Sequence, residues 1–290
     1  MKRLSPTERL TLFFLIGLAL LTFFHRGQVP LWRSQLLFYG LLTALLFILG
    51  LFPDRMNSRG IGRILKDFSP ILFVILTYQS LGNLIQYLWP DVDSYLIQID
   101  HFLFGVHPTV WMERWITPWL TDLLSLAYLS YYFLPVILIV TLYLRGRQEE
   151  FERSVFILTF GYYLSFVGYI LFPAIGPRFT QVHLYSIPLD GSWITDWVRD
   201  TLNALEHNKR DCMPSGHTQI ALMVLYLSHR YEKMLFRIFL PVVCALIFST
   251  VYLRYHYVID LFAGTLFATG SLLIASRLYK RSLPPPSGAS

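Results

Sequence analysis

The chain has 290 residues, of which 54% are hydrophobic and only 14% are charged, and its formal net charge is +6 at pH 7. This composition excludes an ordinary water-soluble domain and is typical of a protein with several membrane spans. The positive charge does not call for a nucleic-acid partner, because lysine and arginine also accumulate in the cytoplasmic loops of membrane proteins.

Eight apolar runs follow one another along the chain, and most approach the roughly 20 residues that a helix needs to cross hydrocarbon. They cover residues 10–24, 35–52, 69–88, 122–144, 154–173, 217–229, 235–253 and 257–276. The first run resembles the apolar part of a signal peptide, but no small-residue cleavage site precedes Trp32. We therefore predict an all-α integral membrane protein with about eight transmembrane helices.

Lysine and arginine residues are concentrated on alternate connections between these runs. With the N-terminus inside, about two thirds of the 24 basic residues fall in inside segments. This bias predicts that both termini are cytoplasmic. We expect an integral protein of the plasma (inner) membrane.

The seven tryptophans all fall in outside segments, as expected of indole rings that prefer the membrane interface. Trp111, Trp115 and Trp119 repeat every four residues, and so do Trp193 and Trp197. This spacing predicts two helices that lie along the membrane surface. They either border the entrance to a site or serve simply as interfacial anchors.

Three polar segments stand at the ends of apolar runs. Gly176-Pro177-Arg178 follows the fifth run, Pro214-Ser215-Gly216-His217 precedes the sixth, and Arg254-Tyr255-His256-Tyr257-Val258-Ile259-Asp260 opens the eighth. Since the spans alternate in direction, all three segments belong to the outer face. Ionisable groups near membrane depth are costly unless they are partnered, so the convergence predicts one functional site.

His256 and Asp260 are four residues apart, which on a helix places both side chains on one face. A carboxylate that accepts a hydrogen bond from one ring nitrogen fixes the imidazole tautomer and leaves the other nitrogen free to attack phosphorus. We predict that His256 is a nucleophile and that Asp260 orients it. The alternative is that both are only polar end groups of a helix.

The second segment has the features of an anion-binding helix start. Pro214 suits the first turn, and Ser215 and Gly216 would then present backbone N–H donors at the positive end of the helix dipole. His217 is placed to protonate a leaving oxygen or to deprotonate an incoming acceptor. The alternative is a simple helix cap.

Arg178 and Arg254 supply planar cations that can each hold phosphate oxygens in pairs. A lone arginine at a membrane edge more often reaches for lipid headgroups. Both arginines lie on the same face as the two histidines, which favours a shared phosphate site.

These segments resemble the three signature motifs of the type 2 phosphatidic acid phosphatase (PAP2) superfamily, over roughly residues 154–276. The string from His256 to Gly264 is most similar to the branch that includes inositol phosphorylceramide synthases. The resemblance implies a six-helix-type catalytic core and metal-independent phosphoryl transfer through a phosphohistidine intermediate. It implies attack by His256, support by Asp260, acid then base catalysis by His217, and phosphate binding by Arg178, Ser215, Gly216 and Arg254.

Two positions depart from the family pattern. Leu171 stands where the family usually has a lysine, and Ser249-Thr250 stands where it usually has Ser-Arg. The third motif offers Arg254 instead, so the grip on phosphate is expected to differ in detail.

No repeat or linker separates domains. We expect N-terminal transmembrane helices and an interfacial segment in residues 1–120, a PAP2-like catalytic membrane domain in 121–280 and a disordered tail in 281–290. Cys212 and Cys244 fit neither a disulfide nor a metal-ligand spacing, and we expect no metal or other cofactor.

Three functions remain open at this point. The first is a membrane hydrolase that removes phosphate from a lipid phosphate or polyprenyl diphosphate at the extracytoplasmic face. The second is a lipid phosphotransferase that passes a phospho-headgroup to an alcohol acceptor. The third is a transporter, whose polar path would include Gln79, Asn83 and Gln86, although these residues also suit hydrogen bonds between helices.

Overall fold

The structure is a computed structural model that describes residues 4–51, 61–205 and 208–282. Within these residues all regular structure is helical, which confirms the predicted fold class. The longer helices are α1 (Pro6–Phe24), α2 (Trp32–Gly50), α3 (Ile61–Leu81), α6 (Pro118–Leu129), α7 (Leu134–Leu144), α8 (Gln148–Leu171), α11 (Gly216–Tyr231), α12 (Lys233–Tyr252) and α13 (Val258–Ser282). Shorter elements are α4 (Asp93–Phe104), α5 (Pro108–Trp111), α9 (Pro177–Thr180), α10 (Thr195–Leu205) and the 3-10 turns η1 (Ile85–Tyr87), η2 (Met112–Trp115), η3 (Ser130–Tyr132) and η4 (Val182–Leu184). The predicted tail over 281–290 lies mostly outside the described residues.

Six of the described helices are long and apolar enough to cross a membrane: α1, α2, α3 with its continuation to Tyr87, α8, α12 and α13. A seventh span results if α6 and α7 form one, with a bend of 48° between them. Pro135, which has no N–H to donate to the preceding turn, lies at the start of α7 and favours this break. The remaining expected span, the sixth run at 217–229, corresponds to α11, whose 16 residues are fewer than a full crossing needs. These helices fit an integral membrane protein.

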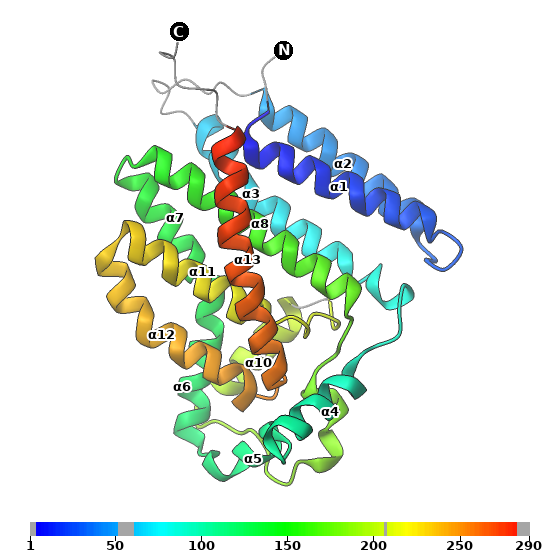
Figure 1. The fold of residues 1–290 in the computed structure, drawn as a ribbon, viewed down its shortest axis with the longest axis vertical. Helices are drawn as coiled ribbons and strands as arrows, with labels where there is room; N and C mark the ends of the chain where they lie inside the picture. The colour runs from blue at the N-terminus through cyan, green and yellow to red at the C-terminus, as the bar shows by residue number, and fades with distance from the viewer. Residues whose placement is uncertain (1–3, 52–60, 206–207, 283–290) are drawn as a thin grey trace.

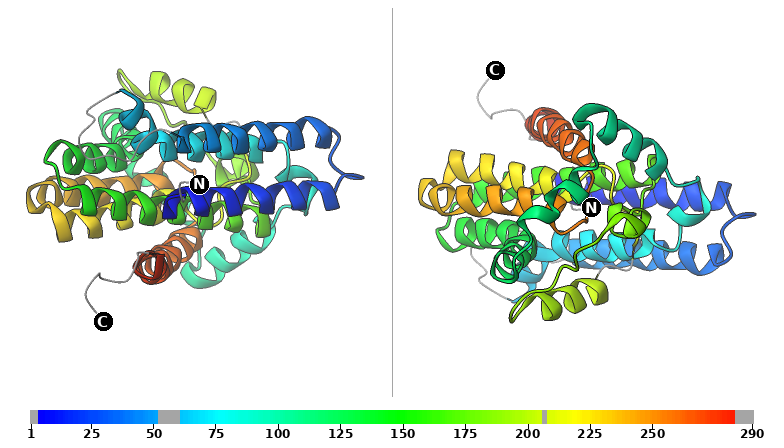
Figure 2. Two further views of the ribbon diagram at one scale, coloured as in Figure 1. Left: turned by 90° about the horizontal axis from the view of Figure 1, so that it is seen from above. Right: turned by 90° about the horizontal axis from the view of Figure 1, so that it is seen from below.

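The central helix of the bundle is α8. It packs against α1, α3, α7, α11 and α13, and 72% of its apolar window is buried inside the protein. A helix that is apolar on all sides suits this position. By contrast, α1 and α2 pair with each other and project from one side of the bundle (Figures 1 and 2).

The start of α1 and the end of α13 lie at the same end of the molecule (Figure 1). There the Arg9 guanidinium donates to the carbonyl oxygen of Ser282 at 3.5 Å, and Lys66 Nζ lies 3.9 Å from Glu8 Oε1. Because α13 ends here, its first residues, which belong to the third motif, lie at the opposite end of this helix, far from the start of α1 (Figure 1). The short helices α4 and α5 lie at that opposite end (Figure 1), and α10 packs against α6.

Two glycines let the motif segments approach each other closely. A Cβ on Gly264 of α13 would lie 2.6 Å from the carbonyl oxygen of Ser215, so α13 and the start of α11 pack backbone against backbone. Gly176 has a φ of +88°, and a Cβ there would lie 2.7 Å from the carbonyl oxygen of Tyr255. Larger residues would therefore force the segments apart.

The prediction of one surface helix through Trp111, Trp115 and Trp119 is wrong. The three residues lie in α5, η2 and α6 respectively. Pro108 and Pro118 each start a new helix, which divides the segment between them. The indole rings of Trp111 and Trp115 nevertheless pack edge to face, with centroids 4.6 Å apart.

Two smaller expectations also differ from the structure. Pro214 precedes the N-cap residue Ser215, so it does not lie in the first turn of α11. The helix α3 ends at Leu81, and Gln86 lies in η1. The polar residues expected to line a transport path therefore do not share one regular α-helical face.

Candidate active site

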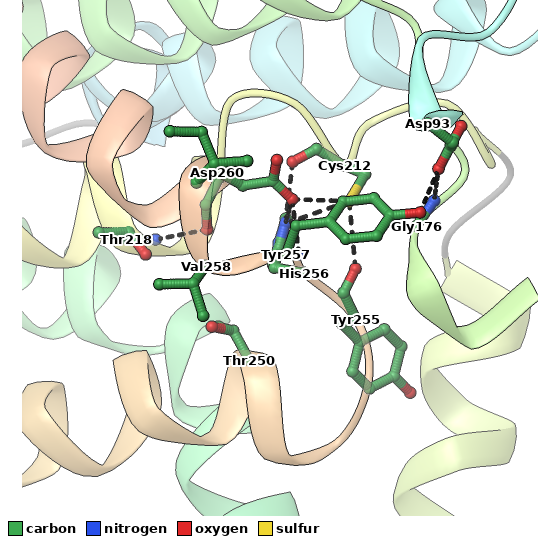
Figure 3. Close-up of polar contacts among 12 residues, drawn as sticks. Asp93, Gly176, Cys212, Thr218, Thr250, Tyr255, His256, Tyr257, Val258 and Asp260 are labelled. Atoms are coloured by element: carbon green, nitrogen blue, oxygen red, sulfur yellow. Dashed lines mark hydrogen bonds and ion pairs between the residues drawn. The ribbon is translucent and has the colours of Figure 1, made fainter. Parts of the chain in front are cut away.

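His256 lies in the connection between α12 and α13, two residues before α13 begins. Its Nδ1 lies 2.9 Å from the carbonyl oxygen of Cys212 and 3.4 Å from Asp260 Oδ2 (Figure 3). Both neighbours are hydrogen-bond acceptors, so Nδ1 carries the hydrogen and Nε2 keeps a free lone pair. The expected pairing of His256 with Asp260 is present, but only Asp260 is helical, and the shorter hydrogen bond goes to Cys212.

Asp260 is fully buried in the first turn of α13. Its Oδ2 accepts hydrogen bonds of 2.9 Å from the Tyr257 N–H and from the Cys212 thiol (Figure 3). The bond from Tyr257, which immediately precedes α13, caps the start of the helix. Asp260 is thus held in place by the same segment that carries His256.

His217 is the second residue of α11. Its ring packs between Tyr128 and Tyr131, with ring centroids 4.3 Å and 4.1 Å away, and lies 5.7 Å from the ring of His256. Its buried Nε2 has no hydrogen-bond partner among the described residues. A buried polar atom that is left unpaired is costly, so this nitrogen is suited to a ligand.

Both imidazoles line a polar pocket of about 320 Å³. The cationic side chains of its wall are Arg178 and Lys209. Arg178, on α9, donates to Asn203 Oδ1 at 3.1 Å and to Tyr255 Oη at 3.3 Å, which holds it at the rim. Two histidines and two cations around one cavity can bind and transfer a phosphoryl group.

Lys209 was not singled out from the sequence. It belongs to a basic pair with Arg210, shortly before the second motif. The guanidinium of Arg210 forms an ion pair with Asp91, at 2.6 Å and 3.1 Å. This basic pair was the signal that the sequence offered. The position of Asp91, which binds Arg210, decides that Lys209 is the residue that lines the pocket.

Ser215 and Gly216 do not line the polar pocket. The Ser215 hydroxyl accepts from the Thr218 N–H at 3.2 Å, and its own N–H donates to the Asp260 carbonyl oxygen at 3.1 Å. A Cβ on Gly216 would meet Tyr169 Oη at 2.2 Å. The structure thus places Ser215 as a helix cap, and phosphate binding by these two residues stays a prediction.

Arg254 also lies off the polar pocket. It lines a neighbouring cavity of about 240 Å³, where its Nη2 donates to Glu113 Oε1 at 2.8 Å and to the Ile187 carbonyl oxygen at 2.7 Å. Its guanidinium lies 3.7 Å from the ring centre of Tyr185. Desolvation lowers the pKa of Arg254. These contacts give Arg254 a structural role, and its binding of phosphate stays a prediction.

Glu113 joins Arg254 to the loop that follows η4. Burial raises the pKa of Glu113, but hydrogen bonds from the Ser186 hydroxyl and the N–H groups of Ile187 and Ser186, together with Arg254, outweigh it and leave the pKa lowered. The carboxylate is therefore charged at neutral pH. Its stabilising contribution is present above its ordinary pKa and is lost as the pH falls through the lowered value.

Arg254→Lys is expected to reduce stability more than phosphate affinity. Lysine keeps the charge but loses the planar group that bridges Glu113 and Ile187 and stacks on Tyr185. We expect a loss of about 1–3 kcal/mol in stability, measured by thermal melting in detergent. Arg178→Lys is the matched comparison and should raise the KM for a phosphate ester with little change in melting. A higher KM without a lower melting temperature in Arg254→Lys would contradict this assignment.

Two carboxylates of α4 organise the motif segments. Asp93 accepts from the N–H groups of Ile175 and Gly176 at 2.9 Å and 2.8 Å, and from Tyr257 Oη at 2.9 Å (Figure 3). Asp100 accepts from the first two N–H groups of α13, at 2.8 Å and 2.9 Å. Desolvation raises the pKa of Asp100. Sequence reasoning missed both residues, although acidic residues at an outer interface are a signal for such capping.

One group of His, Cys and acidic side chains in the described part of the chain has metal-site spacing: Cys212, His256 and Asp260, whose ligand atoms lie within 4.8 Å of one another. Burial, followed by the nearby charge of Asp260, raises the pKa of the Cys212 thiol well above its usual value. A metal needs the thiolate, whereas the protonated thiol donates to Asp260. We therefore assign this cluster to hydrogen bonding that holds the His256 ring in place.

Residues 94–274, more than half of the chain, match the model of the PAP2 superfamily. The chain belongs to this superfamily.

A PA-phosphatase related-family protein of Dictyostelium discoideum is 23% identical over 209 residues, which cover 64% of this chain and 36% of that protein. The chain thus spans about a third of the length of this relative. No solved structure matches the chain.

Proposed function

We propose that this protein is a membrane phosphatase that transfers the phosphoryl group of a lipid phosphate or diphosphate to His256 and then to water. One observation carries the proposal: the rings of His217 and His256 lie 5.7 Å apart on the wall of a pocket that also contains Arg178 and Lys209. Two imidazoles and two cations supply the nucleophile, the proton carrier and the charge that phosphoryl transfer requires.

In the first step, Arg178 and Lys209 attract the phosphate oxygens, over which negative charge spreads in the transition state. Nε2 of His256 forms a bond to phosphorus while the bond from phosphorus to the leaving oxygen breaks. The bound phosphate anion favours the protonated form of His217, which gives its proton to that oxygen. The Cys212 carbonyl and Asp260 accept the Nδ1–H bond and stabilise the positive charge that develops on the ring.

In the second step, neutral His217 takes a proton from water as the water oxygen attacks phosphorus. The bond between Nε2 and phosphorus breaks, inorganic phosphate leaves and His256 returns to its neutral form. An alcohol in place of water would give a transferase through the same intermediate. The similarity of the third motif to inositol phosphorylceramide synthases makes this the alternative to test.

We propose that the site faces the extracytoplasmic side of the plasma (inner) membrane. The end of the molecule that holds the start of α1 and the end of α13 also carries basic residues such as Arg9, Lys66 and Lys280. Such residues favour the cytoplasmic side. The polar pocket lies towards the other end, because its histidines precede α13 and open α11.

A lipid panel tests the proposed reaction. Purified protein in detergent is given phosphatidic acid, a polyprenyl diphosphate and other lipid phosphates labelled on phosphorus, with and without candidate alcohols. A phosphatase releases labelled inorganic phosphate in every condition that supports turnover. Label that appears only in a new lipid, and only when an alcohol is present, would establish a transferase instead. Failure to process any phosphate ester would contradict both.

A further inference from the structure

A second cavity, of about 290 Å³, lies beside the polar pocket. Its walls come from α3, α7 and α8, which include Val74, Ile75, Val136, Ile139, Leu158 and Phe166. All three helices belong to candidate membrane spans. The cavity therefore lies among helices that the bilayer surrounds, and its apolar walls suit a hydrocarbon chain.

His217 and Asp211 line both cavities. The polar pocket on one side of these two residues is lined by Arg178 and Lys209. The second cavity, on their other side, is lined largely by aliphatic and aromatic side chains. A molecule that fills both cavities has an anionic head and an apolar tail, with the junction between head and tail beside His217. The proton carrier would then face the leaving oxygen that joins them.

One wall of the apolar cavity comes from outside the family match. The helix α3 ends at Leu81, whereas the match to the PAP2 model begins at residue 94. α3 packs alongside α8 (Figure 1). The Tyr78 hydroxyl of α3 donates a hydrogen bond to Asp211 Oδ2 at 2.5 Å. Asp211 immediately precedes Cys212 in the chain. An N-terminal helix thus completes the surroundings of the site.

We propose that this cavity holds the hydrocarbon chain of the substrate, so that α3 and α7 select lipid phosphates by chain length. This inference rests on the proposed phosphatase function. Ile75 and Val136, on the two helices, are 50% and 37% exposed on the surface of the molecule as well as lining the cavity. Because both residues line the cavity and also reach the surface of candidate membrane spans, we propose that the lipid chain enters sideways between them.

Substitutions that fill the cavity from either wall test the proposal. Ile75→Trp on α3 and Val136→Trp on α7 add volume at partly exposed positions, where the larger ring does not overpack a closed core. Leu72→Trp and Ile137→Trp are matched controls on the same helices, because both residues are 43% exposed and neither lines the cavity. Thermal melting verifies that each variant is folded, and the two walls give independent tests.

The measurement is kcat/KM for dipalmitoyl and for dihexanoyl phosphatidic acid in the same detergent micelles. Each methylene that loses its place in the cavity weakens binding. We expect the ratio of long-chain to short-chain kcat/KM to fall about tenfold or more in the filled variants. In the controls it should change by less than about twofold.

The possible outcomes separate the two proposals. If both filled variants fold and the ratio of long-chain to short-chain kcat/KM stays unchanged, the substrate chain does not bind in this cavity. The ratio also stays unchanged when kcat/KM falls equally for both lipids. An equal loss would indicate instead that the cavity holds a structural lipid. If the unaltered protein hydrolyses neither phosphatidic acid nor any other phosphate ester, it is the proposed function that fails.

Discussion

Replacement of His256 by alanine is expected to lower kcat roughly 10⁴-fold or more, because it removes the nitrogen that attacks phosphorus. Release of inorganic phosphate from a labelled lipid phosphate measures this loss. Rapid quenching should also trap label on the unaltered protein, in a form that is stable to alkali and labile to acid, as a phosphohistidine is. The variant should carry no such label.

Two further variants distinguish loss of the nucleophile from loss of the fold. His256→Asn keeps an N–H donor near the position of Nδ1, so its hydrogen bond to the Cys212 carbonyl can persist while turnover is still lost. His229→Ala removes an exposed histidine near the C-terminal end of α11, and it should leave turnover unchanged. Normal turnover in either His256 variant would falsify the assignment of the nucleophile.

His217→Phe is expected to lower kcat for a lipid phosphate by about 10²–10⁴-fold. Phenylalanine keeps the aromatic packing between Tyr128 and Tyr131 but cannot carry a proton. An aryl phosphate with an acidic leaving group needs less help to form the intermediate. With that substrate the variant should accumulate labelled phosphohistidine, because the attacking water still needs a base.

A loss of proton transfer from His217 should slow formation of the intermediate more for the lipid phosphate than for the aryl phosphate. The comparison of the two substrates therefore tests whether His217 carries a proton. Quenched-flow experiments with p-nitrophenyl phosphate measure the burst of nitrophenol and the labelled protein together. Equal losses on the aryl and the lipid phosphate, with no accumulated intermediate, would show that His217 only shapes the pocket.

The location of the site could be predicted from the sequence, because it depends only on the alternating direction of successive membrane spans. Apolar runs of known length alternate in direction, so the positions of Arg178, His217 and His256 at run ends were enough to predict one shared face. The structure brings these three residues to one pocket.

The individual side-chain contacts could not be predicted as well from the sequence. Arg254 was predicted to bind phosphate, but its carboxylate partner Glu113 lies 141 positions earlier in the chain. Lys209 was overlooked, although it lines the pocket. A charged side chain takes the partner that folding brings within reach, and no local pattern specifies a partner from a remote loop.

The roles of the α4 carboxylates illustrate the same limit. Asp93 and Asp100 hold the first and third motif segments through backbone N–H groups. Backbone donors are the same at every position except proline, so the sequence alone does not say which of them a carboxylate will cap. Both residues also precede the predicted domain boundary at residue 120, although they position the site beyond it.

The sequence by itself determined the all-helical membrane architecture and the helix ends near which Arg178, His217 and His256 gather. These features follow from local properties: the length of apolar runs and the cost of ionisable groups near hydrocarbon. Only the tertiary structure decided which cations face the pocket, which acceptor orients His256 and which helix walls the cavity next to it. Those depend on distances between remote segments, which close packing of the whole bundle sets.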